Sequence, residues 1–427
     1  MQWILVFFYS ALFCFCISKM KFFRESGLKI QWWILIFLFK VMVGILYGYI
    51  HSLSYGGGDT LYGFKQGVRI YNQLHNHGII IYSKLVFLPC RYPPYAGIEK
   101  WAYNSIPYGD ESYYLIIRFH ALVALVSGCF YNVHVVFFNV LSFSGIVLLY
   151  SAFKNELKEK RFLILAAAVL IPSVVFWTSG IHKDGLALLG IGMLFYSLNS
   201  RQKYAATNFI PAVFAICLLY IIRSYILFIF IPLIIIYLLY KNKENRLHLY
   251  YLSGLVFFTI LILLFSFFYG GVTPIKKIIW WQNAFTYLPP TENSLSLPEL
   301  KPNPVSFFEI IPVSLNHSFL QPLPWRAINF YQGIIGVQEL ILFILLIAAI
   351  FYTLKNRSKF PHLFYISIGY TLSIYTLLGI IVPNLGALSR YKSTGTLFLA
   401  IAIISLIPTH FFQKESNKTT SENKLHL

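Results

Sequence analysis

The sequence predicts an all-α integral membrane protein, a polytopic bundle of about eleven transmembrane helices. Three observations predict this class. Hydrophobic residues make up 58% of the 427 residues and charged residues only 11%, far outside the usual balance of soluble domains. Apolar runs recur from end to end, each long enough, or nearly so, to cross roughly 30 Å of hydrocarbon as a helix. Lysine and arginine gather in alternate connections between these runs.

The predicted spans are helices because, in lipid, a helix satisfies its backbone hydrogen bonds within one segment. They cover residues 1–18, 30–50, 131–153, 162–178, 185–199, 207–222, 225–240, 248–269, 333–353, 361–383 and 394–411. The first run has no basic start and no small-residue cleavage site, so we expect it to be retained as an anchor. The apolar run 114–130 contains Arg118 and His120 and is expected to form an interfacial or partly inserted helix.

The orientation follows from the basic residues of the short connections. Of the 34 lysines and arginines, 19 lie in 19–29, 154–161, 201–203, 241–246, 355–359 and the tail 414–427. Because cytoplasmic loops carry the excess of basic residues, this side is expected to be cytoplasmic, with the N-terminus outside and the tail inside. This bias and attraction to anionic lipid heads explain the net charge of +19, so no nucleic-acid partner is implied.

One transmembrane domain is expected over residues 1–413, with two long outer loops at 51–113 and 270–332. Both loops are rich in Tyr, Trp and Pro, which is typical of short helices and turns on the membrane surface. The five cysteines form no disulfide framework and no metal-ligand spacing. His75 and His77 have no acidic residue nearby in the sequence, so no metal site is predicted there either.

Four basic residues occupy short connections on the predicted outer side, against the tendency that orients the rest of the chain. Lys183 lies in "FWTSGIHKDGLALLG", Arg223 in "YIIRSYILF", and Arg390 with Lys392 in "PNLGALSRYKSTG". Charges at such a depth are a functional-site hypothesis by default. An outer cleft with several cations and few carboxylates is suited to a lipid phosphate or pyrophosphate. His182 belongs to the same turn as Lys183 and is a supporting residue.

Structural alternatives exist for each of these cations. Lys183 and Asp184 could pair with each other or cap the helix that begins there. Arg223 could be a structural partner of Asp184. Arg390 and Lys392 could extend to the headgroups, as cations at helix ends commonly do.

The first outer loop opens with "YGGGDTLYGF", which places Asp59 directly after three glycines. These glycines let the backbone turn sharply as it leaves the second span, so Asp59 is expected just above the membrane plane. All three aspartates of the chain, Asp59, Asp110 and Asp184, map to the outer side. Asp59 is therefore a candidate general base, with a plain turn as the alternative.

These features together resemble the bacterial GT-C superfamily of polytopic glycosyltransferases. The resemblance rests on the acidic residue in "GGGDTLYGF", on "PSVVFWTSGIHKDGL" between two spans, and on "NLGALSRYK" before the last span. It implies transfer of a sugar from a polyprenyl-phosphate donor to a glycan or lipid-linked acceptor at the outer face of a bacterial inner (cytoplasmic) membrane. Asp59 would be the base, while Lys183, Arg223, Arg390 and Lys392 would hold the donor phosphate.

The mechanism that this resemblance implies is direct displacement at the anomeric carbon. A covalent sugar intermediate would need a second carboxylate, for which Asp110, Glu111 and Asp184 are the supporting candidates. Whether a divalent metal takes part is left open by the sequence.

Three other functions remain open. A polysaccharide polymerase or ligase would depend on the outer cations and barely on Asp59. A transporter of lipid-linked oligosaccharides would need a polar path through the bundle and interrupted helices near the midplane. A membrane scaffold would bind no lipid phosphate.

Overall fold

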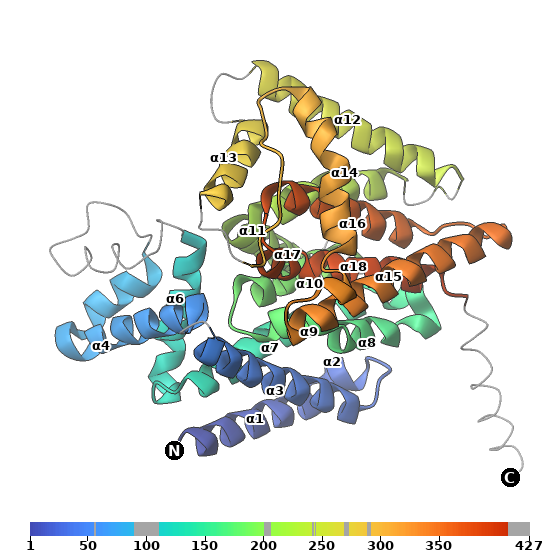
Figure 1. Cartoon of the computed structure of the whole chain (residues 1–427). Coiled ribbons are helices and arrows are strands. Elements are labelled where there is room, and N and C mark those ends of the chain that lie inside the picture. Colours follow the sequence, from blue (N-terminus) through green and yellow to red (C-terminus); the bar gives the residue numbers. More distant parts are fainter. Residues whose placement is uncertain are drawn as a thin grey trace, which may run out of the picture. The chain divides into compact units, whose positions relative to one another are not determined.

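The chain is all-helical in the computed structural model (Figure 1). The structure describes residues 1–54, 57–88, 111–199, 206–240, 243, 245–268, 273–287 and 292–408. Asp110, the side chain of Glu111 and the predicted tail 414–427 lie outside these residues. The α-helices are α1 Gln2–Lys19, α2 Lys21–Arg24, α3 Ile30–Ser54, α4 Gly58–Phe87, α6 Glu111–Ser127, α7 Tyr131–Leu157, α8 Phe162–Leu170, α9 Pro172–Ser179, α10 Lys183–Asn199, α11 Ala206–Tyr240, α12 Leu247–Phe268, α13 Pro274–Thr286, α14 Pro304–Leu320, α15 Phe330–Lys355, α16 His362–Ile381, α17 Leu385–Tyr391 and α18 Ser393–Leu406.

Several of these helices have the length and apolar composition of membrane spans, as the sequence predicts for a multi-pass protein. Within the described residues, seven helices are long and apolar enough, or eight if the bent pair α8 and α9 is counted as one span. The seven are Gln2–Lys19, Ile30–Leu53, Tyr131–Lys160, Phe209–Tyr240, Leu247–Ser266, Phe330–Lys355 and His362–Ile381. The expected number of eleven is not confirmed.

The structure has fewer candidate spans than the expected eleven because some of the helices are interrupted and others are too short. The expected spans 207–222 and 225–240 both lie in α11, which is interrupted at Arg223 by a non-helical backbone (φ −151°, ψ 67°) rather than by a loop. The expected span 162–178 is bent by 76° between α8 and α9, because Pro172 lacks the N–H that would continue the helix. α10 and α18 have only 17 and 14 residues.

The helices form two compact units. The first comprises residues 1–152 and 175–224, and the second comprises residues 153–174 and 225–427.

Buried apolar side chains from α6, α7, α10 and the first half of α11 build a core of the first unit. They include Ile116, Phe138, Leu186 and Leu218. Nearly every residue of α10 from Asp184 to Phe195 is buried, which explains how so short a helix is accommodated. A Cβ atom on Gly192 would lie 2.3 Å from the carbonyl oxygen of Gly145, so this close approach of α7 and α10 requires glycine.

The second unit is built around α15, α16 and α18, which share the core residues Leu342, Leu346, Phe364, Leu399, Ala402 and Ile403. α14 packs closely on α16, where Ser318 Oγ donates to the Tyr375 carbonyl oxygen at 2.7 Å. Lys160 Nζ donates to the carbonyl oxygens of Ser405 and Ile407 at 3.0 and 2.6 Å. This lysine therefore caps the end of α18, where a cation also complements the helix dipole.

The predicted outer loops contain the short helices expected there, and one long helix that was not expected. Residues 270–332 include α13 and α14, which begin at the side-chain caps Thr273 and Asn303. The described part of residues 51–113 consists mainly of the 30-residue α4, which is interrupted at Gly78 (φ 82°, ψ 174°). The predicted interfacial run 114–130 corresponds to α6, which packs along α4.

Candidate functional site

Gly57 and Gly58, directly before Asp59, form a turn such as the sequence predicts. Gly57 caps α4 with φ of 100°, and a Cβ atom there would lie 2.8 Å from the Cβ atom of Leu61. Gly58 also has a positive φ of 48°. This turn places Asp59 in the first turn of α4, where a carboxylate is favoured by the helix dipole. The Asp59 side chain is exposed, so an incoming substrate could reach it.

Tyr113 of α6 joins Asp59 to the "GIHKDG" turn. Its hydroxyl donates a hydrogen bond to the backbone carbonyl oxygen of Asp59. The Nζ atom of Lys183 lies 5.9 Å from the centroid of the same ring. The Thr60 hydroxyl donates to the Ile181 carbonyl oxygen at 3.2 Å, which fixes the start of α4 against the turn. Asp59 and Lys183, the candidate base and one candidate cation, therefore both lie beside Tyr113.

The "GIHKDG" turn itself is held by three buried polar side chains. Lys40 Nζ donates to the hydroxyls of Thr178 and Ser179, both at 3.0 Å. Asn139 Nδ2 donates to the Ser179 carbonyl oxygen at 2.9 Å, and the Ser142 hydroxyl donates to the Thr178 carbonyl oxygen at 2.5 Å. These bonds occupy groups at the end of α9, so the next residues are presented from a rigid support.

His182 is buried in this turn. Its ring centroid lies 5.8 Å from that of Tyr47, in an edge-to-face arrangement. Gly180 packs against the same tyrosine, since a Cβ atom there would lie 2.5 Å from the Tyr47 ring. His182 therefore supports the turn by packing.

Asp184 and Arg223 form a buried ion pair. Arg223 Nη2 donates to Asp184 Oδ1 at 2.9 Å, and the two residues are 8% and 3% exposed. Asp184 also lies in the first turn of α10. This geometry is the one expected if Arg223 is a structural partner of Asp184, with its guanidinium neutralising a buried carboxylate. Lys183, in contrast, is only partly buried.

The remaining two candidate cations belong to the second unit. Arg390 is partly buried at the end of α17, with its Cζ atom 5.3 Å from the centroid of the Tyr391 ring. Lys392 is 1% exposed, and its Nζ atom lies 3.3 Å from Glu339 Oε1. It also donates to the Ser318 carbonyl oxygen at 2.7 Å. Lys392 therefore neither extends to the headgroups nor presents its ammonium group to a lipid phosphate, because it is enclosed by protein.

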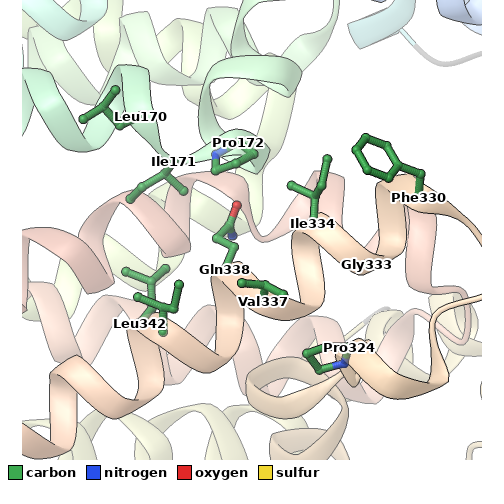
Figure 2. A pocket seen from close by; sticks show the side chains of 11 residues that line it. Leu170, Ile171, Pro172, Pro324, Phe330, Gly333, Ile334, Val337, Gln338 and Leu342 are labelled. Carbon is green, nitrogen blue, oxygen red and sulfur yellow. The ribbon is translucent and has the colours of Figure 1, made fainter.

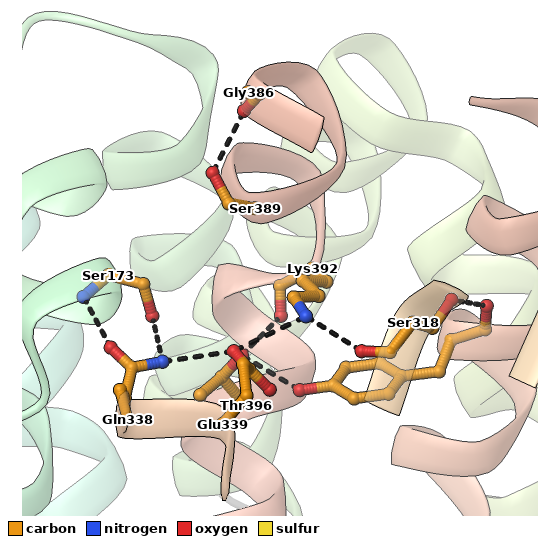
Figure 3. A network of polar contacts seen from close by, with 9 residues as sticks. Ser173, Ser318, Gln338, Glu339, Gly386, Ser389, Lys392 and Thr396 are labelled. Carbon is orange, nitrogen blue, oxygen red and sulfur yellow. Dashed lines mark hydrogen bonds and ion pairs between the residues drawn. The ribbon is translucent and has the colours of Figure 1, made fainter. Parts of the chain in front are cut away.

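Lys392 and Glu339 belong to a buried polar network (Figure 3). Gln338 Nε2 donates to Glu339 Oε1 at 3.0 Å and to the Ser173 hydroxyl at 2.8 Å, while Gln338 Oε1 accepts from the Ser173 backbone N–H at 2.8 Å. That N–H has no partner within α9, because Ser173 is in its first turn. The network thus links the break between α8 and α9 to a buried ion pair.

The same glutamine is the polar residue in an apolar groove (Figure 2). The groove has a volume of about 580 Å³ and runs along the first half of α15 beside the α8–α9 break. Its lining residues are Leu170, Ile171, Pro172, Pro324, Phe330, Gly333, Ile334, Val337, Gln338, Ile341 and Leu342.

The structure thus brings Asp59, Lys183, His182, Asp184 and Arg223 together in the first unit. Among the described residues, no group of three or more His, Cys, Asp or Glu side chains is arranged as metal ligands would be. The sequence interpretation missed two residues. Tyr113 carries no signal in its local pattern, but Glu339 does, since a lone acidic residue within an apolar run marks a site.

No protein family, curated protein or solved structure matches this chain.

Proposed function

We propose that this protein is a membrane glycosyltransferase that moves a sugar from a polyprenyl-phosphate donor to an acceptor at the outer face of a bacterial inner membrane. One observation carries the proposal. Asp59 and Lys183, the candidate base and the candidate phosphate ligand, are joined through Tyr113, which bonds the Asp59 carbonyl oxygen and lies 5.9 Å from the Lys183 ammonium group.

In this mechanism, the exposed Asp59 carboxylate accepts the proton of the acceptor hydroxyl. The hydroxyl oxygen then forms a bond to the anomeric carbon, while the bond from that carbon to the phosphate oxygen breaks. The departing lipid phosphate takes the electron pair of that bond, and the Lys183 ammonium stabilises its growing charge. Both groups act from helix starts, α4 and α10, whose positive dipole ends favour an anion.

Arg223 has a positioning role in this proposal, because its guanidinium is paired with Asp184. The pair fixes the start of α10 and hence the direction from which Lys183 reaches the site. Lys392 is left out of the phosphate site, because it is buried against Glu339. Arg390 belongs to the second unit and has no role in this mechanism. The N-terminus outside and the C-terminus inside remain part of the proposal.

Binding of a polyprenyl-phosphate-linked sugar to the purified full-length protein tests the proposal. We expect Lys183→Ala to weaken binding about 10- to 100-fold, as for loss of a charge-assisted contact to phosphate. Lys65→Ala is the matched control, since Lys65 is an exposed lysine on α4. Equal affinities in the wild type and in the Lys183 variant would rule out the proposed phosphate site.

A transporter of lipid-linked oligosaccharides is the second candidate. Two features favour it: the buried pair formed by Glu339 of α15 and Lys392, which directly precedes α18, and the broken helix α8–α9. Such features are typical of transport pathways. In reconstituted vesicles, transport predicts that a fluorescent lipid-linked sugar crosses the bilayer and that Glu339→Gln abolishes this. If the labelled lipid crosses the bilayer no faster than in protein-free vesicles, transport is excluded.

A further inference from the structure

A stripe of aromatic and basic side chains lies on one face of α13 in the second unit. Lys277, Trp281 and Phe285 follow one another at intervals of four residues, so they lie on the same side of the helix. Eight residues of helix separate the first from the last, a rise of about 12 Å. This set of three is called the α13 stripe below.

The α13 stripe faces aromatic residues of α11 and α17. The Trp281 ring centroid lies 6.4 Å from that of Tyr225, edge to face, and the Phe285 centroid lies 6.3 Å from that of Tyr391. Cations are present at both ends. Lys277 Nζ is 5.0 Å from the Trp281 ring centroid, and Arg390 Cζ is 5.3 Å from that of Tyr391. Trp281, Phe285 and Tyr391 are partly exposed, so a ligand can reach their rings.

The position of α13 is fixed by a buried glutamine. Gln282 Nε2 donates to the carbonyl oxygens of Ile380 and Pro298 at 2.9 and 3.1 Å, and its Oε1 accepts from the Leu300 N–H at 2.9 Å. The following segment is tied to the start of α17, since the Leu295 N–H donates to the Pro383 carbonyl oxygen at 2.7 Å. A stripe on so firmly anchored a helix is preorganised for binding.

A different face of α13 has the character of a membrane-interface anchor. Trp280 is 65% exposed and Tyr287, just after the helix, is 87% exposed, as expected of aromatic residues at the headgroup level. The α13 stripe differs from these residues, because its rings are half-buried against other aromatic rings and are combined with two cations. Interfacial anchoring therefore accounts for Trp280 but leaves the α13 stripe unexplained.

We infer that the α13 stripe, together with Arg390 and Tyr391, binds the carbohydrate of a phosphate-linked glycan. The apolar faces of a sugar ring pack on Trp281 and Phe285, whose flat surfaces are suited to C–H groups. Lys277 and Arg390 donate hydrogen bonds to hydroxyl or anionic groups at the two ends. The inference rests on the proposed function for its ligand class, a sugar carried on a lipid phosphate.

Two probes test the inference with the full-length protein in phosphatidylcholine nanodiscs: tritiated farnesyl phosphate, and the same lipid carrying glucose or N-acetylglucosamine. We expect the sugar-bearing probe to bind about fivefold to tenfold more tightly than farnesyl phosphate, a ratio that corresponds to the binding free energy of one aromatic contact. Trp281→Leu should abolish this preference, because leucine is apolar but has no aromatic face. Trp281→Phe should retain most of it.

Trp280→Leu is the matched control, since it removes the neighbouring indole from the interfacial face. Equal affinity of the wild type for all probes, or an equal loss in the Trp280 and Trp281 variants, would overturn the inference. If farnesyl phosphate is displaced by phosphatidylglycerol in the nanodiscs and no sugar preference exists, the stripe binds lipid headgroups and the inference is wrong.

Lys183→Ala separates this inference from the proposed function. Lys183 belongs to the first unit and the α13 stripe to the second, so this variant should leave the preference for sugar unchanged. A Lys183 variant that binds both probes like the wild type, while Trp281→Leu loses the preference, would contradict the proposed function alone. Failure of the wild type to bind any probe would contradict both.

Discussion

Replacing Arg223 by methionine tests whether this arginine is a partner of Asp184 or a ligand of phosphate. The two side chains are buried and joined by one charge-assisted hydrogen bond of 2.9 Å. Removing the guanidinium leaves a buried carboxylate without its cation, and breaking such a pair costs about 3–5 kcal/mol. Arg223→Met should therefore lower the free energy of unfolding by about that amount, a large part of a typical stability of about 5–15 kcal/mol.

A double-mutant cycle measures the pair directly. Asp184→Asn removes the charge that Arg223 neutralises, so the double variant should be less destabilised than the sum of the single variants by about 2–3 kcal/mol. Unfolding in detergent, followed by circular dichroism, gives the four free energies. The folded fraction of Arg223→Met should still bind a polyprenyl-phosphate sugar. The reasoning is refuted if Arg223→Met weakens binding as much as Lys183→Ala while the free energy of unfolding changes by less than about 0.5 kcal/mol.

Three further changes probe the two units. Glu339→Ala should destabilise the protein by about 3–5 kcal/mol, because Lys392 would remain buried without its counterion. Thermal unfolding of Glu339→Ala, Lys392→Met and the double variant measures this loss, and the double variant should recover part of the stability that Glu339→Ala loses. Gly57→Ala should lower the free energy of unfolding by about 1–3 kcal/mol, because alanine is strained at a φ of 100° and its Cβ atom meets the Leu61 side chain. Gly78→Ala should also be destabilising by the same measurement, because a φ of 82° with a ψ of 174° is a backbone conformation that glycine alone adopts readily, although the space around it is open. Tyr113→Phe should lower the free energy of unfolding by only about 1 kcal/mol, because one hydrogen bond to the Asp59 carbonyl oxygen is lost. It should also lower the turnover number, because this bond positions Asp59. An unchanged turnover number would argue against positioning by Tyr113.

The sequence predicted the class of the fold because apolar runs and helix formation in lipid depend on local composition. It did not predict the division into two units or the number of spans. Pro172 and Arg223 show the reason, since both lie within long apolar stretches where the backbone is interrupted without any polar loop. Whether such an interruption becomes a turn or a bend depends on packing with other helices, which a single sequence does not show.

Part of the candidate site could also be predicted. The glycine turn before Asp59 follows from residue type alone, since few residues other than glycine adopt a φ of 100°. The Arg223–Asp184 pair was one of the alternatives that the sequence offered, but the sequence did not decide between this pair and a phosphate ligand. The burial of Lys392 against Glu339 was not predicted, because the two residues lie far apart in the sequence and meet only in the tertiary structure.

Sugar release from a polyprenyl-phosphate sugar, measured together with binding in the same samples, tests the central claim about Asp59 and Lys183 most directly. Asp59→Asn should bind the donor like the wild type but turn over about 10²- to 10⁴-fold more slowly, because the general base is lost. Lys183→Ala should instead lose affinity. An Asp59→Asn variant that releases sugar at the wild-type rate would contradict the account and favour a polymerase or ligase that depends on its cations.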